Sequence, residues 1–124
     1  ALYYRAKAYV KQKADKKAMD DFRELAKDTR NPYGAEAKYL VAQSLYDAKE
    51  YAAAEKELLN YIEQSTPHAY WLARSFVLLS DVYAATGKDL DARQYLLSLQ
   101  QNYQGNDDIA SMIESRLAKL KGEN

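Results

Sequence analysis

The feature that most constrains the fold of this chain is an internal repeat. Four columns of residues recur with the same two offsets, 36 and then 38 residues. Within each copy the two small-residue columns are always 12 residues apart, so all variation in length falls between copies, where a loop absorbs it. Repeats of this length are typical of stacked helical units. The columns are Ala6, Ala42 and Ser80; Tyr9, Leu45 and Tyr83; Ala18, Ala54 and Ala92; and Phe22, Leu58 and Leu96.

The apolar residues inside each copy have helical spacing. Leu72, Phe76, Leu79 and Tyr83 follow one another at intervals of three or four residues, and strand-like alternation is absent. Two prolines and four glycines in 124 residues leave long stretches uninterrupted. The pattern predicts an all-α chain with helices at about 2–12, 15–29, 34–48, 51–65, 68–86, 89–103 and 107–121.

Turn residues mark the helix boundaries. Asn31–Pro32 and Thr66–Pro67 each combine a capping side chain with a proline, which we expect at the first helical position. Gly87 falls in the turn of the third copy. At Gln104–Asp107 a glycine ends one helix and acidic residues cap the next.

These columns resemble the tetratricopeptide repeat, whose pattern runs from a large residue through leucine, a small residue and tyrosine to alanine and phenylalanine. The third copy matches best, and the first two copies place Arg5 and Lys38 where the family usually has apolar residues. The resemblance implies a right-handed α-solenoid of three helix-turn-helix units followed by a capping helix. We expect the units at about 1–31, 32–66 and 67–105 and the capping helix at 106–121, together forming one domain at 1–124.

The two ends of the repeat array differ. The last segment places Ile109, Ile113 and Leu120 on one face and lacks the small-residue column, as a lid over the final unit would. Ala1 falls at the third position of its unit, so we expect further repeats upstream and interpret the chain as the C-terminal part of a longer protein.

Composition and motifs exclude several functions. Eighteen basic residues balance eighteen acidic ones, which argues against nucleic acid as a partner, and no apolar run is long enough to insert into a membrane. The chain has no cysteine and a single histidine, His68, so we expect neither a metal site nor a cofactor. No phosphate loop or nucleophile motif occurs, and we predict that the chain is not an enzyme.

A binding surface is the remaining candidate site. In the family that this chain resembles, the first helix of each unit lines the concave wall, and partners lie against it. Tyr39 and Tyr46 lie seven residues apart on that face, either as interface anchors or as rings packed against the next unit. The surface carried over position by position comprises Tyr3, Lys7, Val10, Lys11, Glu36, Tyr39, Gln43, Tyr46, Asp47, Arg74, Val77 and Asp81.

The resemblance therefore predicts a non-catalytic module that binds a peptide or protein partner on its concave face. Two alternatives stay open: a structural segment that self-associates through its uncapped first unit, and an accessory domain of a larger envelope-associated protein. The repeat lengths and junctions are similar to those of bacterial envelope proteins. That similarity favours the periplasm or cell envelope and leaves the cytoplasm open.

Overall fold

The computed structural model describes residues 1–64 and 67–121, with the side chain of Lys121 excepted. This part of the chain is all-α, with seven helices and no strand. The helices are α1 (Leu2–Lys11), α2 (Asp15–Leu25), α3 (Pro32–Asp47), α4 (Tyr51–Glu63), α5 (Ala69–Ala85), α6 (Asp89–Asn102) and α7 (Ile109–Lys121).

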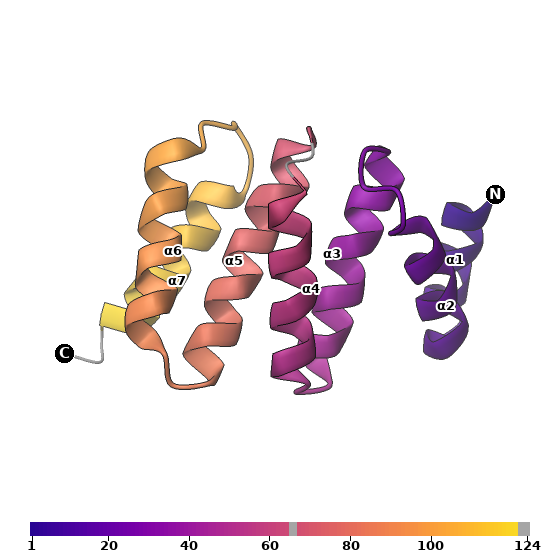
Figure 1. Cartoon of the computed structure of the whole chain (residues 1–124), viewed down its shortest axis with the longest axis horizontal. Helices are drawn as coiled ribbons and strands as arrows, with labels where there is room; N and C mark the ends of the chain where they lie inside the picture. Colours follow the sequence, from indigo (N-terminus) through magenta and orange to yellow (C-terminus); the bar gives the residue numbers. More distant parts are fainter. Residues whose placement is uncertain (65–66, 122–124) are drawn as a thin grey trace.

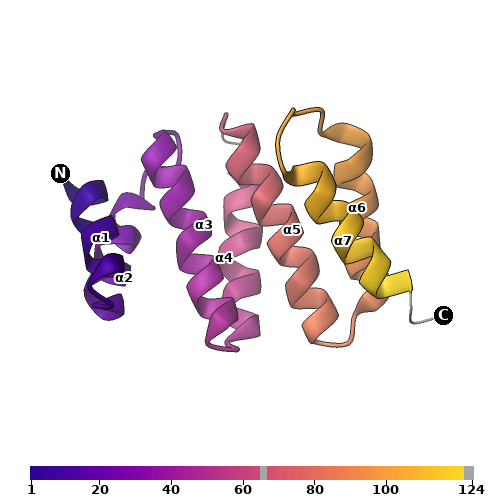
Figure 2. The same cartoon turned by 180° about the vertical axis from the view of Figure 1, so that it is seen from behind.

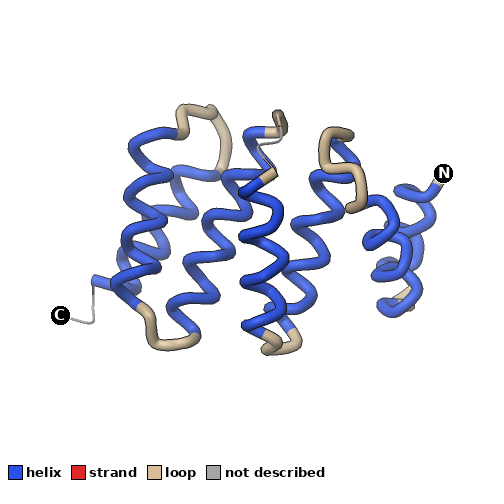
Figure 3. Tube along the Cα trace, viewed as in Figure 1, coloured by secondary structure: helices blue, strands red, loops and turns tan. Residues whose placement is uncertain are grey.

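The helices stand side by side along the longest axis of the molecule, with the two termini at opposite ends (Figure 1). Each helix packs against the next one in the chain, and α5 also packs against α3 and α7. Seen from behind, α1, α3, α5 and α7 lie in front and form one layer (Figure 2). The other layer consists of α2, α4 and α6, and short loops connect the two (Figure 3). We call these the odd layer and the even layer.

The turns inside the three helix pairs repeat in register. One residue of each turn has a positive φ: Lys13 (59°), Lys49 (62°) and Gly87 (80°), at the same offsets of 36 and 38 residues as the sequence columns. This left-handed residue is how a Schellman motif ends a helix. The backbone amide of the next residue then donates a hydrogen bond to a carbonyl oxygen in the last turn of the helix. The three bonds are Ala14 N to Tyr9 O (2.8 Å), Glu50 N to Leu45 O (2.9 Å) and Lys88 N to Tyr83 O (2.8 Å), and the accepting residues form one of the sequence columns.

The loops between helix pairs follow the predicted boundaries less closely. Asn31 caps α3 as predicted, because its side chain accepts a hydrogen bond from the amide of Tyr33 at 2.8 Å. The prediction for Pro67 is wrong: α5 begins at Ala69, so the proline lies before the helix, and Thr66 lies outside the described residues. Asp107 accepts from the amide of Ile109 at 3.0 Å, as expected for a cap before α7.

The second helix ends four residues earlier than the predicted residue 29. It stops at Leu25, and the chain then folds back over the start of α3. Gly34 permits this approach, since a Cβ atom there would lie 1.9 Å from the carbonyl oxygen of Asp28. The periodic apolar pattern cannot reveal such a close backbone contact, so it predicts too long a helix.

The core is divided into two clusters. The small residues of both columns are buried, from fully covered to 3 % exposed, as the column alignment predicts. Ala6, Ala18 and Phe22 of the first helix pair form a cluster with Ala37 and Val41 of α3. The larger cluster extends from α3 to α7. Leu40 and Leu45 pack against both clusters and connect them.

The two charged residues at usually apolar repeat positions form ion pairs within their own units. Arg5 donates to both carboxylate oxygens of Asp21, at 2.9 and 2.7 Å. Lys38 lies 3.0 Å from Glu57. In the third unit the counterparts of Lys38 and Glu57 are Phe76 and Tyr95, whose ring centroids are 5.9 Å apart. Each basic residue at a usually apolar position on the first helix of a unit is thus paired with a carboxylate on the second helix of that unit.

Candidate functional site

The predicted surface residues all lie on α1, α3 and α5, the helices that face the viewer in Figure 2. The structure connects most of them to one another through hydrogen bonds or ion pairs. Two of them, Tyr39 and Val77, are buried in the core. The accessible part of the surface is therefore smaller than the sequence predicts.

Tyr39 and Val77 are the two residues of the predicted surface that the structure places in the core. Tyr39 is 4 % exposed and Val77 is 1 % exposed. Both residues occupy the same repeat position as Tyr3. Tyr39 lies on α3, against which α5 packs, and Val77 lies on α5, against which α7 packs. The Tyr39 ring packs against the neighbouring unit, since its centroid lies 5.6 Å from that of the Trp71 ring.

Arg74 is the centre of a polar network between α3 and α5. Its Nη2 donates to the Tyr39 hydroxyl at 3.0 Å and its Nη1 to the Tyr70 hydroxyl at 2.9 Å. Burial disfavours the charge, but these two hydrogen bonds outweigh it, and the pKa of Arg74 is raised. The guanidinium carbon lies 4.8 Å from the Tyr39 ring centroid and 5.9 Å from that of Trp71. A charged Arg74 therefore stabilises the contact between α5 and α3.

The network continues in both directions along the odd layer. The Tyr39 hydroxyl donates to Gln43 at 3.0 Å, and Gln43 donates to Asp47 at 2.9 Å. On the other side, the Tyr70 hydroxyl donates to Asp108 at 2.9 Å. The i, i+4 spacing of Tyr70 and Arg74 is visible in the sequence, but the part played by Asp108 is not, because it comes from a loop 38 residues away.

Two ion pairs occupy the ends of the same layer. Lys7 on α1 contacts Glu36 on α3 at 2.8 Å, and the Tyr3 hydroxyl donates to the same carboxylate at 3.0 Å. Burial lowers the pKa of Lys7, but the hydrogen bond and charge of Glu36 outweigh it, so the pKa is raised. At the other end Asp81 on α5 pairs with Arg116 on α7 at 3.2 Å. These charged residues stabilise contacts between helices.

Tyr46 is half-buried beside the second of these ion pairs. Its ring packs against Tyr51 with centroids 5.5 Å apart. Burial and the negative charge of Asp81 raise its pKa, so the phenol stays neutral near pH 7. Lys11 and Asp47 are the charged members of the predicted surface that are exposed.

A groove of about 330 Å³ lies between α1, α2 and α3. Its apolar part comes from Val10 on α1, Met19 and Phe22 on α2, and Leu40 on α3. Its polar part includes Gln43 and Asp47, two residues of the predicted surface, together with Asp15 and Ser44. The groove is therefore the place where predicted contact residues and accessible apolar surface coincide.

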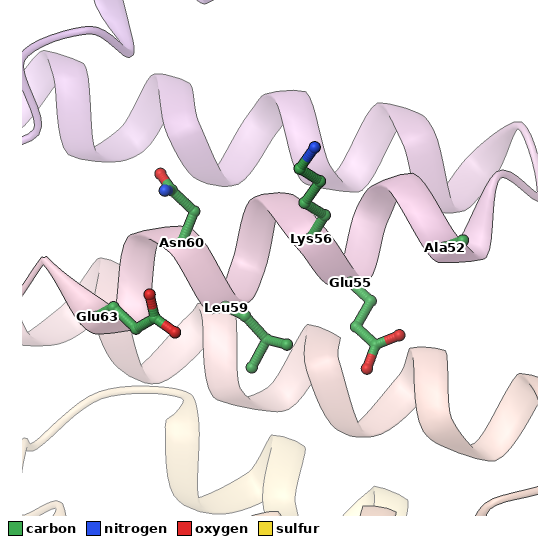
Figure 4. A pocket seen from close by; sticks show the side chains of 6 residues that line it. All are labelled: Ala52, Glu55, Lys56, Leu59, Asn60 and Glu63. Atoms are coloured by element: carbon green, nitrogen blue, oxygen red, sulfur yellow. The ribbon is translucent and has the colours of Figure 1, made fainter.

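A shallow depression of about 440 Å³ lies on the even layer and is formed by α4 alone. Leu59, Glu55 and Glu63 point to one side of the helix and Lys56 and Asn60 to the other (Figure 4). Glu55 already accepts a hydrogen bond from the Tyr83 hydroxyl at 2.8 Å. Because its side chains diverge, the depression lacks the converging polar groups of a ligand site.

No group of three or more histidine, cysteine, aspartate or glutamate residues within residues 1–64 and 67–121 is arranged to hold a metal ion. His68 precedes α5, and its Nε2 lies 2.7 Å from the carbonyl oxygen of Arg30, so it connects two loops.

The described helices include none that is long and apolar enough to cross a bilayer. The sequence matches no protein-family model and no curated protein sequence.

Proposed function

We propose that this chain is a non-catalytic protein-interaction module that binds a peptide or protein partner on its odd layer. We further propose that it is a right-handed solenoid of three tetratricopeptide-like units with α7 as the capping helix. The repeated Schellman turns at Lys13, Lys49 and Gly87 support this architecture, since they have the same offsets as the sequence columns.

The observation that carries the functional proposal is the groove between α1, α2 and α3. It combines an apolar floor with two carboxylates, Asp15 and Asp47, and peptide-binding grooves commonly pair apolar contact area with a few orienting polar groups. Val10 is 48 % exposed, which is a large solvent-accessible area for a valine at the edge of such a groove. An apolar side chain of a partner would cover it.

The test uses peptides selected by display against the full chain. We expect Val10→Asp to weaken their binding by about ten-fold or more, because a charge placed on the apolar wall must be desolvated when the peptide binds. Leu90→Asp is the matched control, since Leu90 is an exposed apolar residue on α6, in the even layer. Affinities that are unchanged by Val10→Asp, or equally reduced by Leu90→Asp, would contradict a binding site in this groove.

A second candidate function, self-association through α1, rests on a different observation. Tyr4 is 64 % exposed, whereas the residue at the same repeat position in the third unit, Leu78, is 2 % exposed. Tyr4 belongs to an aromatic cluster with Tyr3 and Tyr33, in which the ring centroids are 4.4 to 6.4 Å apart. Sedimentation of the wild type and of Tyr4→Glu over a range of concentrations tests this function. A wild-type chain that stays monomeric at every concentration would exclude it.

A further inference from the structure

The even layer contains a cationic pocket that the odd-layer function does not use. The pocket has a volume of about 210 Å³ and lies between α2, α3 and α4. Three of its lining residues are cations, and one is a carboxylate. Its lining consists of Arg23, Ala26, Lys27, Lys38, Val41, Glu57 and Gln64.

The charges in this pocket are only partly neutralised. Lys38 has a side chain that is 12 % exposed and pairs with Glu57 at 3.0 Å. Lys27 pairs with Glu24 at 3.0 Å, but both of these side chains are largely exposed, so solvent and salt weaken that pair. Arg23 makes no ion pair within the part of the chain that the structure describes. The pocket therefore keeps a positive excess.

The fold does not require cations at these positions. At the next junction, between the second and third helix pairs, the repeat places Leu59 where Arg23 stands and Phe76 where Lys38 stands. The position of Glu57 is taken by Tyr95, which packs on Phe76. Apolar side chains thus fill the same place elsewhere in this chain, and they generally stabilise a buried site at least as well as an ion pair does.

We propose that this pocket binds a glutamate or aspartate side chain of a protein partner. Charge complementarity identifies the occupant: a carboxylate matches the planar guanidinium of Arg23 and offsets the ammonium groups of Lys27 and Lys38. The amide of Gln64 already accepts from Thr29 at 2.5 Å and donates to Asn60 at 2.9 Å. The cations are therefore the groups left to bind the ligand.

The partner segment would lie at the C-terminal end of α2, whereas the groove of the proposed function lies against the N-terminal part of that helix. The pocket shares no lining residue with that groove. The two proposals can consequently fail independently. A chain that binds peptides in the groove and ignores acidic side chains would retain the first function and lose the second.

The experiment titrates the full chain with acetyl-Gly-Glu-Gly-amide, in which the glutamate provides the single carboxylate, and follows the backbone amides by NMR. Acetyl-Gly-Gln-Gly-amide is the matched neutral probe. We expect shifts centred on α2 and on the facing turns of α3 and α4 with the glutamate probe alone. Raising NaCl from about 0.05 to 0.5 M should abolish them, because salt screens the attraction.

Four variants locate the binding. Arg23→Gln and Lys38→Met should each weaken binding by about five-fold or more, since each removes one cation of the pocket. Lys56→Gln, on the exposed side of α4, makes the same charge change outside the pocket and should leave binding within about two-fold. The double variant Arg23→Gln/Lys27→Gln changes only exposed residues, so it tests the proposal even if Lys38→Met fails to fold.

Several outcomes would overturn the proposal. Equal shifts with the glutamine probe would show that the carboxylate is not recognised. Equal losses in Lys56→Gln would show general electrostatic attraction rather than a site. Inorganic phosphate is the third probe, and shifts with phosphate but none with the glutamate peptide would identify a phosphate site instead.

Discussion

The two junctions between successive helix pairs occupy equivalent places in the repeat but differ in chemistry. The first, where α2 meets α3, contains the cationic pocket, the open groove and the ion pair of Lys7 with Glu36. The second, where α4 meets α5, is filled by buried residues such as Leu78, Leu79 and Val82. The same arrangement of helices thus accommodates either polar or apolar side chains at the junction. The apolar junction provides cohesion, and the polar junction leaves surface available for partners.

The largest expected effect separates the two cores. Leu79→Ala should lower the free energy of unfolding of the chain by about 2 to 5 kcal/mol, because Leu79 is fully buried in the larger cluster. Phe22→Ala creates a cavity in the small cluster, which is joined to the rest through Leu40 and Leu45. We expect Phe22→Ala to unfold mainly α1 and α2.

Amide hydrogen exchange of both variants measures this difference. Phe22→Ala should lose protection in α1 and α2 while α5 and α6 remain protected. Leu79→Ala should reduce protection in every helix. If both variants shift a single common unfolding transition by similar amounts, the two junctions are equally cohesive and the comparison is wrong.

The next effect concerns the small residues of the repeat. Ala54→Leu should cost about 1 to 3 kcal/mol, because Ala54 is fully buried and the added atoms would overpack the contact between α3 and α4. Ala18→Leu, one unit earlier, should cost less, because Ala18 also lines the groove, which can take up part of the larger side chain. Thermal unfolding of both variants measures this. An unchanged melting temperature for Ala54→Leu would contradict the column alignment.

A smaller effect, of opposite sign, is expected at the turns. Lys49→Gly should stabilise the chain by about 0.5 to 1 kcal/mol, since a left-handed residue with a Cβ atom is strained and glycine is not. Lys13→Gly should act in the same direction on the first helix pair. Gly87→Ala is the reverse control and should destabilise. Urea unfolding of the three variants decides whether the turns are equivalent in energy as well as in geometry.

The pH dependence of the first helix pair gives the smallest effect. Hydrogen bonds with Arg5 lower the pKa of Asp21, and burial opposes this shift. A carboxyl whose folded pKa is depressed stabilises the fold above its unfolded pKa of about 4, and that contribution is lost as the pH falls toward the folded value. The first helix pair should therefore loosen in acid.

The control for this prediction is the neighbouring exposed residue. Asp21→Asn should remove part of the difference in stability between pH 6 and pH 3, whereas Asp20→Asn should leave it unchanged. Urea titrations at the two pH values measure both. If Asp21→Asn shows the same acid sensitivity as the wild type, the pair of Arg5 and Asp21 contributes nothing to the junction.

The sequence predicted the first six helices because their apolar positions recur at fixed offsets, and it predicted α7 from the apolar spacing of that segment alone. Both patterns depend only on the chain itself. It predicted α2 too long because the contact of Gly34 with the carbonyl of Asp28 depends on where the loop lies in space. The sequence also placed Pro67 at the first helical position, whereas α5 begins at Ala69.

The exposure of the candidate surface could not be predicted from the sequence. Transfer from one unit to the next placed the candidate residues on the odd-layer helices but treated each helix as equally exposed. Tyr39 and Val77 are buried because a following helix packs on each of their helices, whereas Lys11 and Asp47 remain exposed. The exposure of a side chain depends on the helices that pack around it, and the apolar pattern of one helix does not show where those neighbouring helices lie.

The shared turn geometry has a consequence for chain engineering. Because Lys13 and Lys49 end their helices with the same left-handed residue and the same hydrogen bonds, the segments that follow them are interchangeable at the level of the backbone. A chain in which residue 13 is joined directly to residue 50 would omit one repeat length and create no new kind of loop. We therefore expect that the molecule can be shortened, or by the reverse operation lengthened, in steps of one complete unit.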